Sequence, residues 1–312
     1  MSTVAGQSEG PNLVFQSTPV HNGPRCQSTV ADAAVVEGFG YWSGKDVRVE
    51  FHPAEKHSGF VFIREDLEIP VRIPATVDCR IETPRRTTLV SGGSQVEMVE
   101  HVLAALSGLG ITNCEIRVNQ SEMPGCDGSS RAFVEAIDKV GIRIQDASEP
   151  RLVVREPIRI GDADHWIEAR PALDGITSFR YRLDYTESSI AIGRQTVEFP
   201  MTPDIFRSEI ACCRTFMLEQ EAEWLLAQGL GTRVKPTDIL VFDQQGPKEN
   251  TLIFQDECAR HKVLDMVGDF ALAGCYVVGK VVAHRSGHRL NADFIRALLK
   301  EEQIEFPCRK TA

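Results

Sequence analysis

Residues 260–302, RHKVLDMVGDFALAGCYVVGKVVAHRSGHRLNADFIRALLKEE, decide the fold that this sequence predicts. Their pattern indicates a helix with an apolar face, a strand in CYVVGKVVAH, a glycine loop in RSGHRLN and a second helix. The same order occurs earlier, where a helix predicted over 94–110 opens with the capping-box spacing of Ser94 and Glu97. A strand (NCEIRVN), a glycine loop (CDGSS) and a helix (RAFVEAIDKVG) follow it. Histidines and loop glycines keep an offset of about 160 positions between the two copies: His101 and His261, Gly128 and Gly287.

This repeat predicts an α+β fold of two similar domains, each a sheet covered by two helices, with the helix layers packed between two outer sheets. The competing interpretation is a chance similarity of two α+β segments. We place a first domain at 27–146, a linker at DASEP (146–150) and a second domain at 150–305. Residues 1–26, rich in Gly, Pro, Ser and Gln, are predicted to be a flexible leader.

The helix near residue 261 carries a polar stripe as well as an apolar one. His261, Asp265 and Asp269 follow one another at four-residue spacing, so they share one helix face. The helix near residue 101 likewise has an apolar stripe, and Glu100 and His101 lie on its other side. A solvated polar face is the simpler interpretation of each stripe. If the two halves pack helix layer against helix layer, both stripes instead face one cleft.

Such a cleft would bring together the ligands of a catalytic zinc. His101, His261 and Asp265 supply the nitrogen and oxygen donors of a three-ligand site with an open fourth position. Zinc lowers the pKa of its water to about 7, and Glu100 beside His101 is a candidate general base. His288 in the SGH loop is a candidate acid, which Asp269 can keep protonated. Glu100 as a solvated helix residue and His288 as a loop histidine bonded to backbone remain alternatives.

Composition limits the other classes of function. A net charge of −10 disfavours binding to nucleic acid or anionic membranes. The nine cysteines contain no CxxC pair, which predicts reduced thiols and a cytoplasmic location. No run approaches the ~18 apolar residues of a membrane span, and no targeting signal is evident. Searches for HExxH, GxSxG, the P-loop and GxGxxG are negative.

The motifs also carry a resemblance to a known family. The chain resembles the UDP-3-O-acyl-N-acetylglucosamine deacetylases, zinc amidases of lipid A biosynthesis. The matching segments cover about residues 27–300 in the family's order: GFGYWSGKDVRVEFHPA, VEHVLAALSGLGITNCEI, EMPGCDGSSRAFVEAI, CRTF, DECARHKVLDMVGDFALAG and SGHRLNADFIRAL. The resemblance implies hydrolysis of the acetamide of UDP-3-O-acyl-N-acetylglucosamine, the committed step of that pathway, with Zn2+ as cofactor.

The resemblance implies roles for the residues at matching positions. The zinc ligands would be His101, His261 and Asp265, with Glu100 as general base and His288, oriented by Asp269, as catalytic histidine. Thr215 would hold the tetrahedral intermediate, Phe216 would lie near the sugar, and Lys262 would meet the nucleotide phosphates. A segment near 216–235 resembles the family's insert that forms a passage for the acyl chain, although core packing explains its apolar residues equally well.

Two stretches depart from the family pattern. GFGYWSG has Tyr41 and Trp42 where the family usually has the histidine-containing GxGLHSG, and GTRVKPTDILVF lacks the Gly- and Asp/Asn-bearing pattern common after the insert. Both concern contacts to sugar and acyl chain. They leave open a zinc amidase acting on another acetylated sugar. A non-catalytic homologue that binds acylated sugar nucleotides is a further alternative. We expect a monomer whose partner is the UDP-linked acylated glucosamine, with no nucleic acid and no membrane span.

Overall fold

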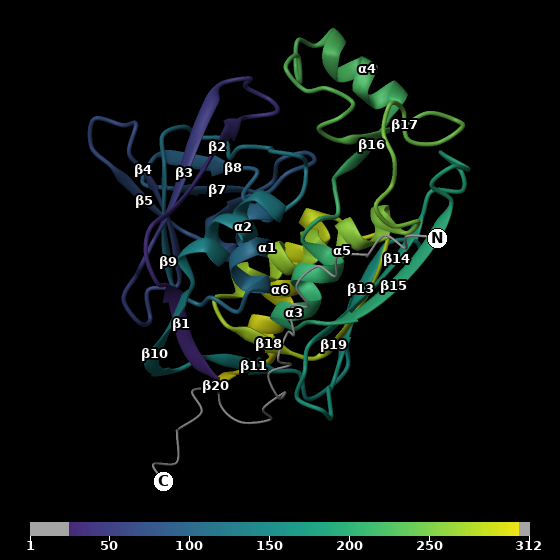
Figure 1. Cartoon of the computed structure of the whole chain (residues 1–312). Helices are drawn as coiled ribbons and strands as arrows, with labels where there is room; N and C mark the ends of the chain where they lie inside the picture. The colour runs from purple at the N-terminus through teal and green to yellow at the C-terminus, as the bar shows by residue number, and fades with distance from the viewer. Residues whose placement is uncertain (1–24, 306–312) are drawn as a thin grey trace, which may run out of the picture.

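A computed structural model of the chain describes residues 25–305. Two five-stranded sheets stand on either side of a layer of helices (Figure 1). The first sheet has the order β2 (Ala34–Phe39), β3 (Asp46–His52), β9 (Cys114–Val118), β4 (Phe60–Arg64) and β5 (Val71–Pro74). The second has the order β12 (Ile158–Gly161), β13 (Trp166–Arg170), β19 (Lys280–His284), β14 (Ser178–Asp184) and β15 (Arg194–Pro200).

The two sheets have the same topology. In each, the third and fourth strands of the order pair in parallel, as β9 with β4 and β19 with β14, and every other pair is antiparallel. Burial alternates along β3 and β14, as expected for strands with one face on a core. The repeat detected in the sequence is therefore present in the strand order. The division into domains at 146–150 stays a prediction.

Four helices lie between the sheets: α1 (Glu100–Gly108), α2 (Arg131–Val140), α5 (Glu257–Phe270) and α6 (His288–Glu301). The polar stripes of α1 and α5 meet because these two helices pack directly on one another. Gly268 permits the close approach, since a Cβ there would lie 2.0 Å from the carbonyl oxygen of Glu100. The expected α+β fold, with helices between outer sheets, is confirmed.

The predicted start of the first helix was wrong. Ser94–Glu97 is strand β8, which pairs antiparallel with β7 (Thr88–Ser91), and β7 pairs in turn with β6 (Arg80–Ile81). Gly92 and Gly93, both at positive φ, make the tight turn of that hairpin. The helix begins only at Glu100. The capping-box spacing was thus a strand pattern, because a sheet partner supplies backbone bonds that the sequence window does not show.

Smaller elements complete the described chain. Two small sheets join distant segments: β1 (Cys26–Val30) pairs with β10 (Ile142–Ser148), and β11 (Arg151–Val153) pairs with β18 (Tyr276–Val278) and β20 (Ile304–Glu305). Because β10 reaches Ser148, most of the linker expected at 146–150 is strand. The short helical elements are η1 (Val77–Cys79), α3 (Pro203–Ile205), η2 (Phe206–Ile210) and η3 (Ala271–Ala273). The predicted leader lies outside the described residues except for Arg25 and Cys26.

The insert projects from the second half of the chain (Figure 1). It contains β16 (Phe216–Leu218), α4 (Glu219–Ala227) and β17 (Leu240–Phe242), with β16 and β17 paired in parallel. We call residues 216–242 the insert. Among residues 25–305, no helix is both long and apolar enough to cross a membrane.

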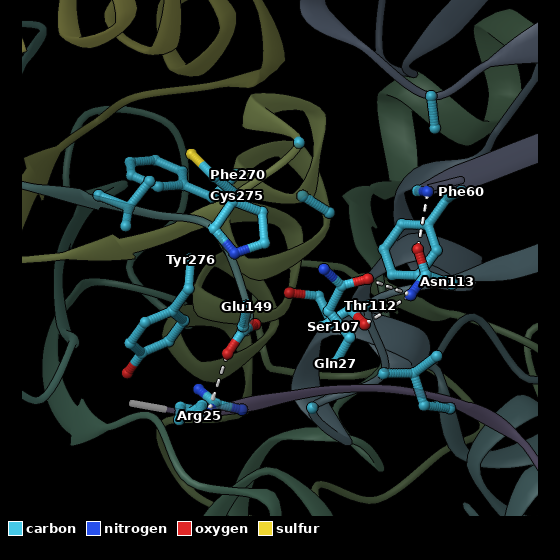
Figure 2. A pocket seen from close by; sticks show the side chains of 18 of the residues that line it. Arg25, Gln27, Phe60, Ser107, Thr112, Asn113, Glu149, Phe270, Cys275 and Tyr276 are labelled. Atoms are coloured by element: carbon cyan, nitrogen blue, oxygen red, sulfur yellow. Dashed lines mark hydrogen bonds and ion pairs between the residues drawn. The ribbon is translucent and has the colours of Figure 1, made fainter. Parts of the chain in front are cut away.

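A cavity of about 450 Å³ lies where segments of both halves meet (Figure 2). Arg25 lines it, with its Nε 3.1 Å from Glu149 Oε2 and its guanidinium 4.4 Å from the centre of the Tyr276 ring. Burial raises the pKa of Glu149 to about 7 against the opposing effect of Arg25. The ion pair therefore joins the start of β1 to the residue after β10 at a cost in desolvation of Glu149, and the contact with the Tyr276 ring joins Arg25 to the second half.

Candidate active site

The three candidate ligands converge at the contact between α1 and α5. Asp265 Oδ1 lies 3.6 Å from His101 Nε2 and 3.4 Å from His261 Nε2, and the two imidazole rings are nearly perpendicular. One ligand atom from each residue lies within 4.8 Å of the others. All three side chains are buried. Two imidazole nitrogens and one carboxylate oxygen aimed at a common point fit the donor set of a divalent metal such as zinc.

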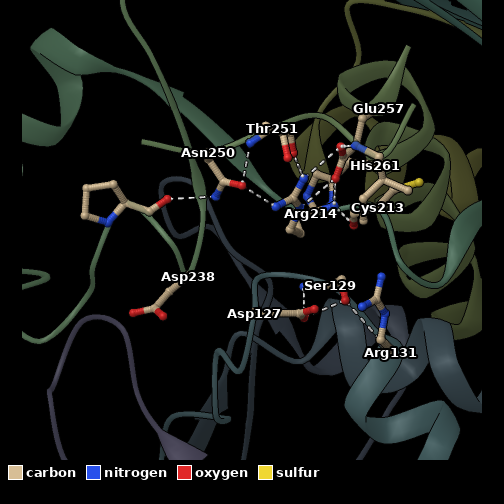
Figure 3. Close-up of polar contacts among 12 residues, drawn as sticks. Asp127, Ser129, Arg131, Cys213, Arg214, Asp238, Asn250, Thr251, Glu257 and His261 are labelled. Carbon is tan, nitrogen blue, oxygen red and sulfur yellow. Dashed lines mark hydrogen bonds and ion pairs between the residues drawn. The ribbon is translucent and has the colours of Figure 1, made fainter. Parts of the chain in front are cut away.

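His261 is held in the form that a ligand needs. Burial lowers its pKa to about 3, so the ring is neutral. Its Nδ1 lies 3.1 Å from the carbonyl oxygen of Cys213, which only accepts, so Nδ1 carries the proton and Nε2 keeps its lone pair. Figure 3 shows this contact beside Arg214, whose guanidinium binds both oxygens of the buried Glu257 at 2.8 and 3.0 Å. That ion pair fixes the Cys213 segment to the start of α5.

The two carboxylate oxygens of Asp265 have different neighbours. Lys262 Nζ donates to Oδ2 at 2.8 Å, which leaves Oδ1 facing the histidines. Burial opposes ionisation, but the Lys262 ammonium holds the pKa of Asp265 well below its usual value. The carboxylate is therefore charged. Lys262 itself lies 5.6 Å from the centre of the Phe216 ring.

Glu100 is buried beside the ligand cluster. Its Oε2 accepts from the backbone N–H of Thr87 at 3.0 Å, and its Oε1 lies 4.0 Å from His288 Nε2. Burial raises the pKa of Glu100, with His288 and His101 opposing. A carboxylate whose pKa is raised, and whose position is fixed by a hydrogen bond to one oxygen, suits a general base.

His288 is oriented by Asp269. The distance from His288 Nδ1 to Asp269 Oδ2 is 2.9 Å, and Asn291 Nδ2 donates to the same oxygen at 2.8 Å. Thr87 Oγ1 donates to the other oxygen at 2.8 Å. Burial disfavours the imidazolium, but Asp269 overcomes it, helped by Asp265 and Glu100, and the pKa of His288 rises to about 10. The ring is therefore protonated at neutral pH.

These groups open into one cavity of about 820 Å³. Glu100, His288 and Lys262 line it. Thr215 and Phe216 enter it from the start of the insert, where Thr215 N donates to the carbonyl of Gly128 at 2.7 Å. The Phe216 ring meets the His261 ring edge-on at 6.3 Å. The cavity continues along the insert, so it is far larger than a metal with one water requires.

The structure places all nine residues singled out in the sequence within or directly behind this cavity. Sequence reasoning missed three supporting groups: Thr87, the Cys213 carbonyl and Asn291. Asn291 had a signal, because it stands three residues after His288 and shares its helix face. Thr87 lies far from both carboxylates in sequence and had none. A backbone carbonyl has no side chain to read.

Helices between two matching sheets, with a His/His/Asp cluster beside a buried glutamate and a histidine in one cavity, are the features of a metal-dependent hydrolase. The comparisons give the family. Residues 27–300 match the model of the UDP-3-O-acyl N-acetylglycosamine deacetylases, and the chain belongs to that family.

Relatives support the same assignment. A UDP-3-O-acyl-N-acetylglucosamine deacetylase of Anaeromyxobacter sp. (strain Fw109-5) is 37% identical over 276 residues, covering 88% of this chain and 89% of the relative. Proteins of that name from Shewanella sp. (strain W3-18-1) and Shewanella oneidensis are each 34% identical over 280 residues, covering 88% of this chain and 90% of the relative.

Proposed function

We propose that this protein is a zinc-dependent deacetylase that removes acetate from the 2-acetamido group of UDP-3-O-acyl-N-acetylglucosamine, the committed step of lipid A biosynthesis. The observation that carries the proposal is the convergence of His101, His261 and Asp265 beside Glu100 and His288 in one cavity. Family membership supports the substrate.

In this proposal His101, His261 and Asp265 hold the zinc. When bound, the metal acts as a Lewis acid that acidifies water and polarises the acetamide carbonyl. The donor set fits this use because His261 and Asp265 are already in their binding forms. His261 is neutral, and Lys262 occupies only the second oxygen of Asp265.

Glu100 and His288 divide the proton transfers. Glu100 accepts a proton from the attacking water through Oε1, since Thr87 occupies Oε2. His288, protonated and oriented by Asp269, donates through Nε2 to the amine that leaves. The hydroxyl of Thr215 stabilises the tetrahedral intermediate from the rim of the cavity.

The remaining roles concern binding. We assign Lys262 to the nucleotide phosphates and Phe216 to the sugar, because both line the cavity next to the ligand cluster. The insert is the passage for the 3-O-acyl chain. We place the protein in the cytoplasm as a monomer; the free thiols of the cysteines from Cys79 to Cys275 support the reducing compartment.

A deacetylation assay tests the proposal. Purified protein is incubated with a synthetic UDP-3-O-decanoyl-N-acetylglucosamine, and free amine and acetate are measured. We expect release that stops with a chelator and returns with stoichiometric zinc. Turnover of UDP-N-acetylglucosamine at the same kcat/KM would favour a different acetylated sugar, because remote binding energy from the chain is expressed in catalysis. Stoichiometric binding without release would favour a non-catalytic homologue.

A further inference from the structure

The turn between β2 and β3, GYWSGK (40–45), is where the sequence departs from its family. Side chains from other segments hold this turn in place. Glu122 caps the turn: its two oxygens accept from the backbone N–H groups of Trp42 and Ser43, each at 2.7 Å. Gly40 leaves room for that carboxylate, since a Cβ there would lie 2.3 Å from it. The turn is thus fixed from within the first half of the chain.

Tyr41 fastens the turn to the insert. Its ring lies over Gly125, where a Cβ would be 2.1 Å from the aromatic carbons. Its hydroxyl lies 3.0 Å from the carbonyl oxygen of Cys126 and 3.1 Å from that of Asp238. Burial raises the pKa of Tyr41 well above its usual value, so the phenol keeps its proton and donates. One side chain therefore joins the turn, the 125–128 loop and the insert.

Two further contacts attach the insert to the first half. Arg233 Nη1 donates to the carbonyl of Gly44 at 2.6 Å and to Asp46 at 2.8 Å. Arg85 pairs with Glu221 on α4 at 2.9 Å. The insert is thereby anchored at two places to the first half, and residues of the turn and of the insert line the same cavity.

Trp42 belongs to the part of the turn that reaches this cavity. It lines the cavity, and the Arg86 guanidinium, held by Glu97 at 2.7 Å, covers one face of the indole at 4.6 Å. Apolar side chains of the insert line the same cavity: Met217, Leu225, Leu230, Val234, Ile239 and Val241. An indole with one face covered by a cation, in a cavity whose insert side carries these aliphatic residues, suits an apolar occupant better than a phosphate or a sugar hydroxyl.

We propose that Trp42 is a specificity-determining residue that forms the first-half wall of the passage for the substrate's 3-O-acyl chain, and that Tyr41 positions this wall against the insert. This inference rests on the proposed function for the identity of the substrate. It explains why an aromatic pair stands at 41–42: the passage has one wall from the insert and needs a second from the opposite half.

Calorimetric binding tests the inference separately from turnover. Each buried methylene is worth a factor of roughly four in affinity, so a wall that covers two or three methylenes contributes about 10- to 60-fold. All proteins carry Glu100→Gln to prevent hydrolysis. The probes are UDP-N-acetylglucosamine with a 3-O-acetyl or a 3-O-decanoyl group. We expect Trp42→Ala to weaken decanoyl binding by that factor and acetyl binding by less than twofold.

Three further variants sharpen the result. Trp166→Ala is the matched control, because Trp166 on β13 also has an arginine guanidinium over its ring, that of Arg159 at 4.0 Å, lies outside the residues that line the cavity and should change neither affinity. Tyr41→Phe keeps the ring over Gly125 but loses both carbonyl contacts, and it should weaken only decanoyl binding, by about three- to tenfold. Trp42→His, the residue type usual in the family, retains the turn and should fall between wild type and Trp42→Ala.

The outcomes separate the two proposals. Equal loss of acetyl and decanoyl binding in Trp42→Ala would place Trp42 at the sugar or nucleotide and overturn the inference, as would no loss of either. Wild-type protein that releases no acetate, yet loses decanoyl affinity selectively in Trp42→Ala, would overturn the proposed function and leave the passage wall standing.

Discussion

Replacing Asp269 by Asn should move the alkaline limb of the pH–rate profile to lower pH. Asn keeps the size of the side chain and removes its charge. Asp269 Oδ2 lies 2.9 Å from His288 Nδ1, which places the charge centres about 4 Å apart. At an effective dielectric constant of about 20 this interaction is worth about 4 kcal/mol, or about three pH units.

The sign follows from the role of the proton. His288 donates, so kcat/KM falls as pH rises through its pKa, which is about 10 in the wild type. In Asp269→Asn the limb should begin near pH 7. Considering protonation of His288 alone, kcat/KM of the wild type and the variant should then differ little at pH 6 and by about tenfold at pH 8. The zinc site stays intact, because Asp269 is not among the three ligands.

The assay measures kcat/KM of the zinc-loaded protein from pH 5.5 to 10.5. Asn291→Ala is the control, because it removes a hydrogen bond to Asp269 and leaves the charge; its alkaline limb should move by less than about one unit. NMR titration of the His288 imidazole gives a second readout. An alkaline limb that stays in place in Asp269→Asn, while metal content is normal, would show that the donated proton does not come from His288.

Three other changes are predicted. His101→Ala, His261→Ala and Asp265→Ala should each abolish tight zinc binding, so metal analysis showing one full equivalent in any of them would exclude that ligand. Glu100→Gln should keep zinc and lower kcat by about 10²- to 10⁴-fold, and near-normal turnover would require another base. Glu149→Gln should raise the melting temperature at pH 8, because the pKa of Glu149 in the folded protein, about 7, exceeds its ordinary value. The wild-type protein is therefore most stable at low pH, where Glu149 is protonated, and its free energy of unfolding falls as pH rises through 7 and the buried carboxyl ionises. The gain from Glu149→Gln should be up to about 3 kcal/mol and disappear by about pH 4.5; a lower melting temperature at pH 8 would show that the ion pair outweighs its burial.

Periodicity predicted the parts of the fold that repeat. The spacing of polar and apolar residues on α1 and α5 predicted a shared cleft, and the packing of those helices confirms it. The hairpin at 88–97 was not predictable in the same way, since its partner strand and its two-glycine turn decide the structure of Ser94–Glu97 over local helix preference. Local signals identify an element only where no distant segment competes for its backbone.

In the candidate site, too, some features follow from local sequence pattern and others from contacts with distant segments. The candidate site residues could be named because His261, Asp265 and Asp269 share one helix face at four-residue spacing. The groups that orient them could not be read from the sequence. Thr87 bonds both Glu100 and Asp269 from a strand end, and a carbonyl of the Cys213 residue selects the tautomer of His261. Such contacts arise from tertiary proximity, which a single sequence does not encode as a motif.

Substitutions of Gly268 should affect activity as strongly as substitutions of the candidate site residues. It has no functional group, yet the backbone of Glu100 passes where its side chain would be. Any larger residue there would push α1 from α5 and carry the base and one imidazole away from the other imidazole and the carboxylate together. A mutational scan scored by activity would therefore group Gly268 with the residues of the candidate site. Its contribution is the close approach of two helices, not a chemical group.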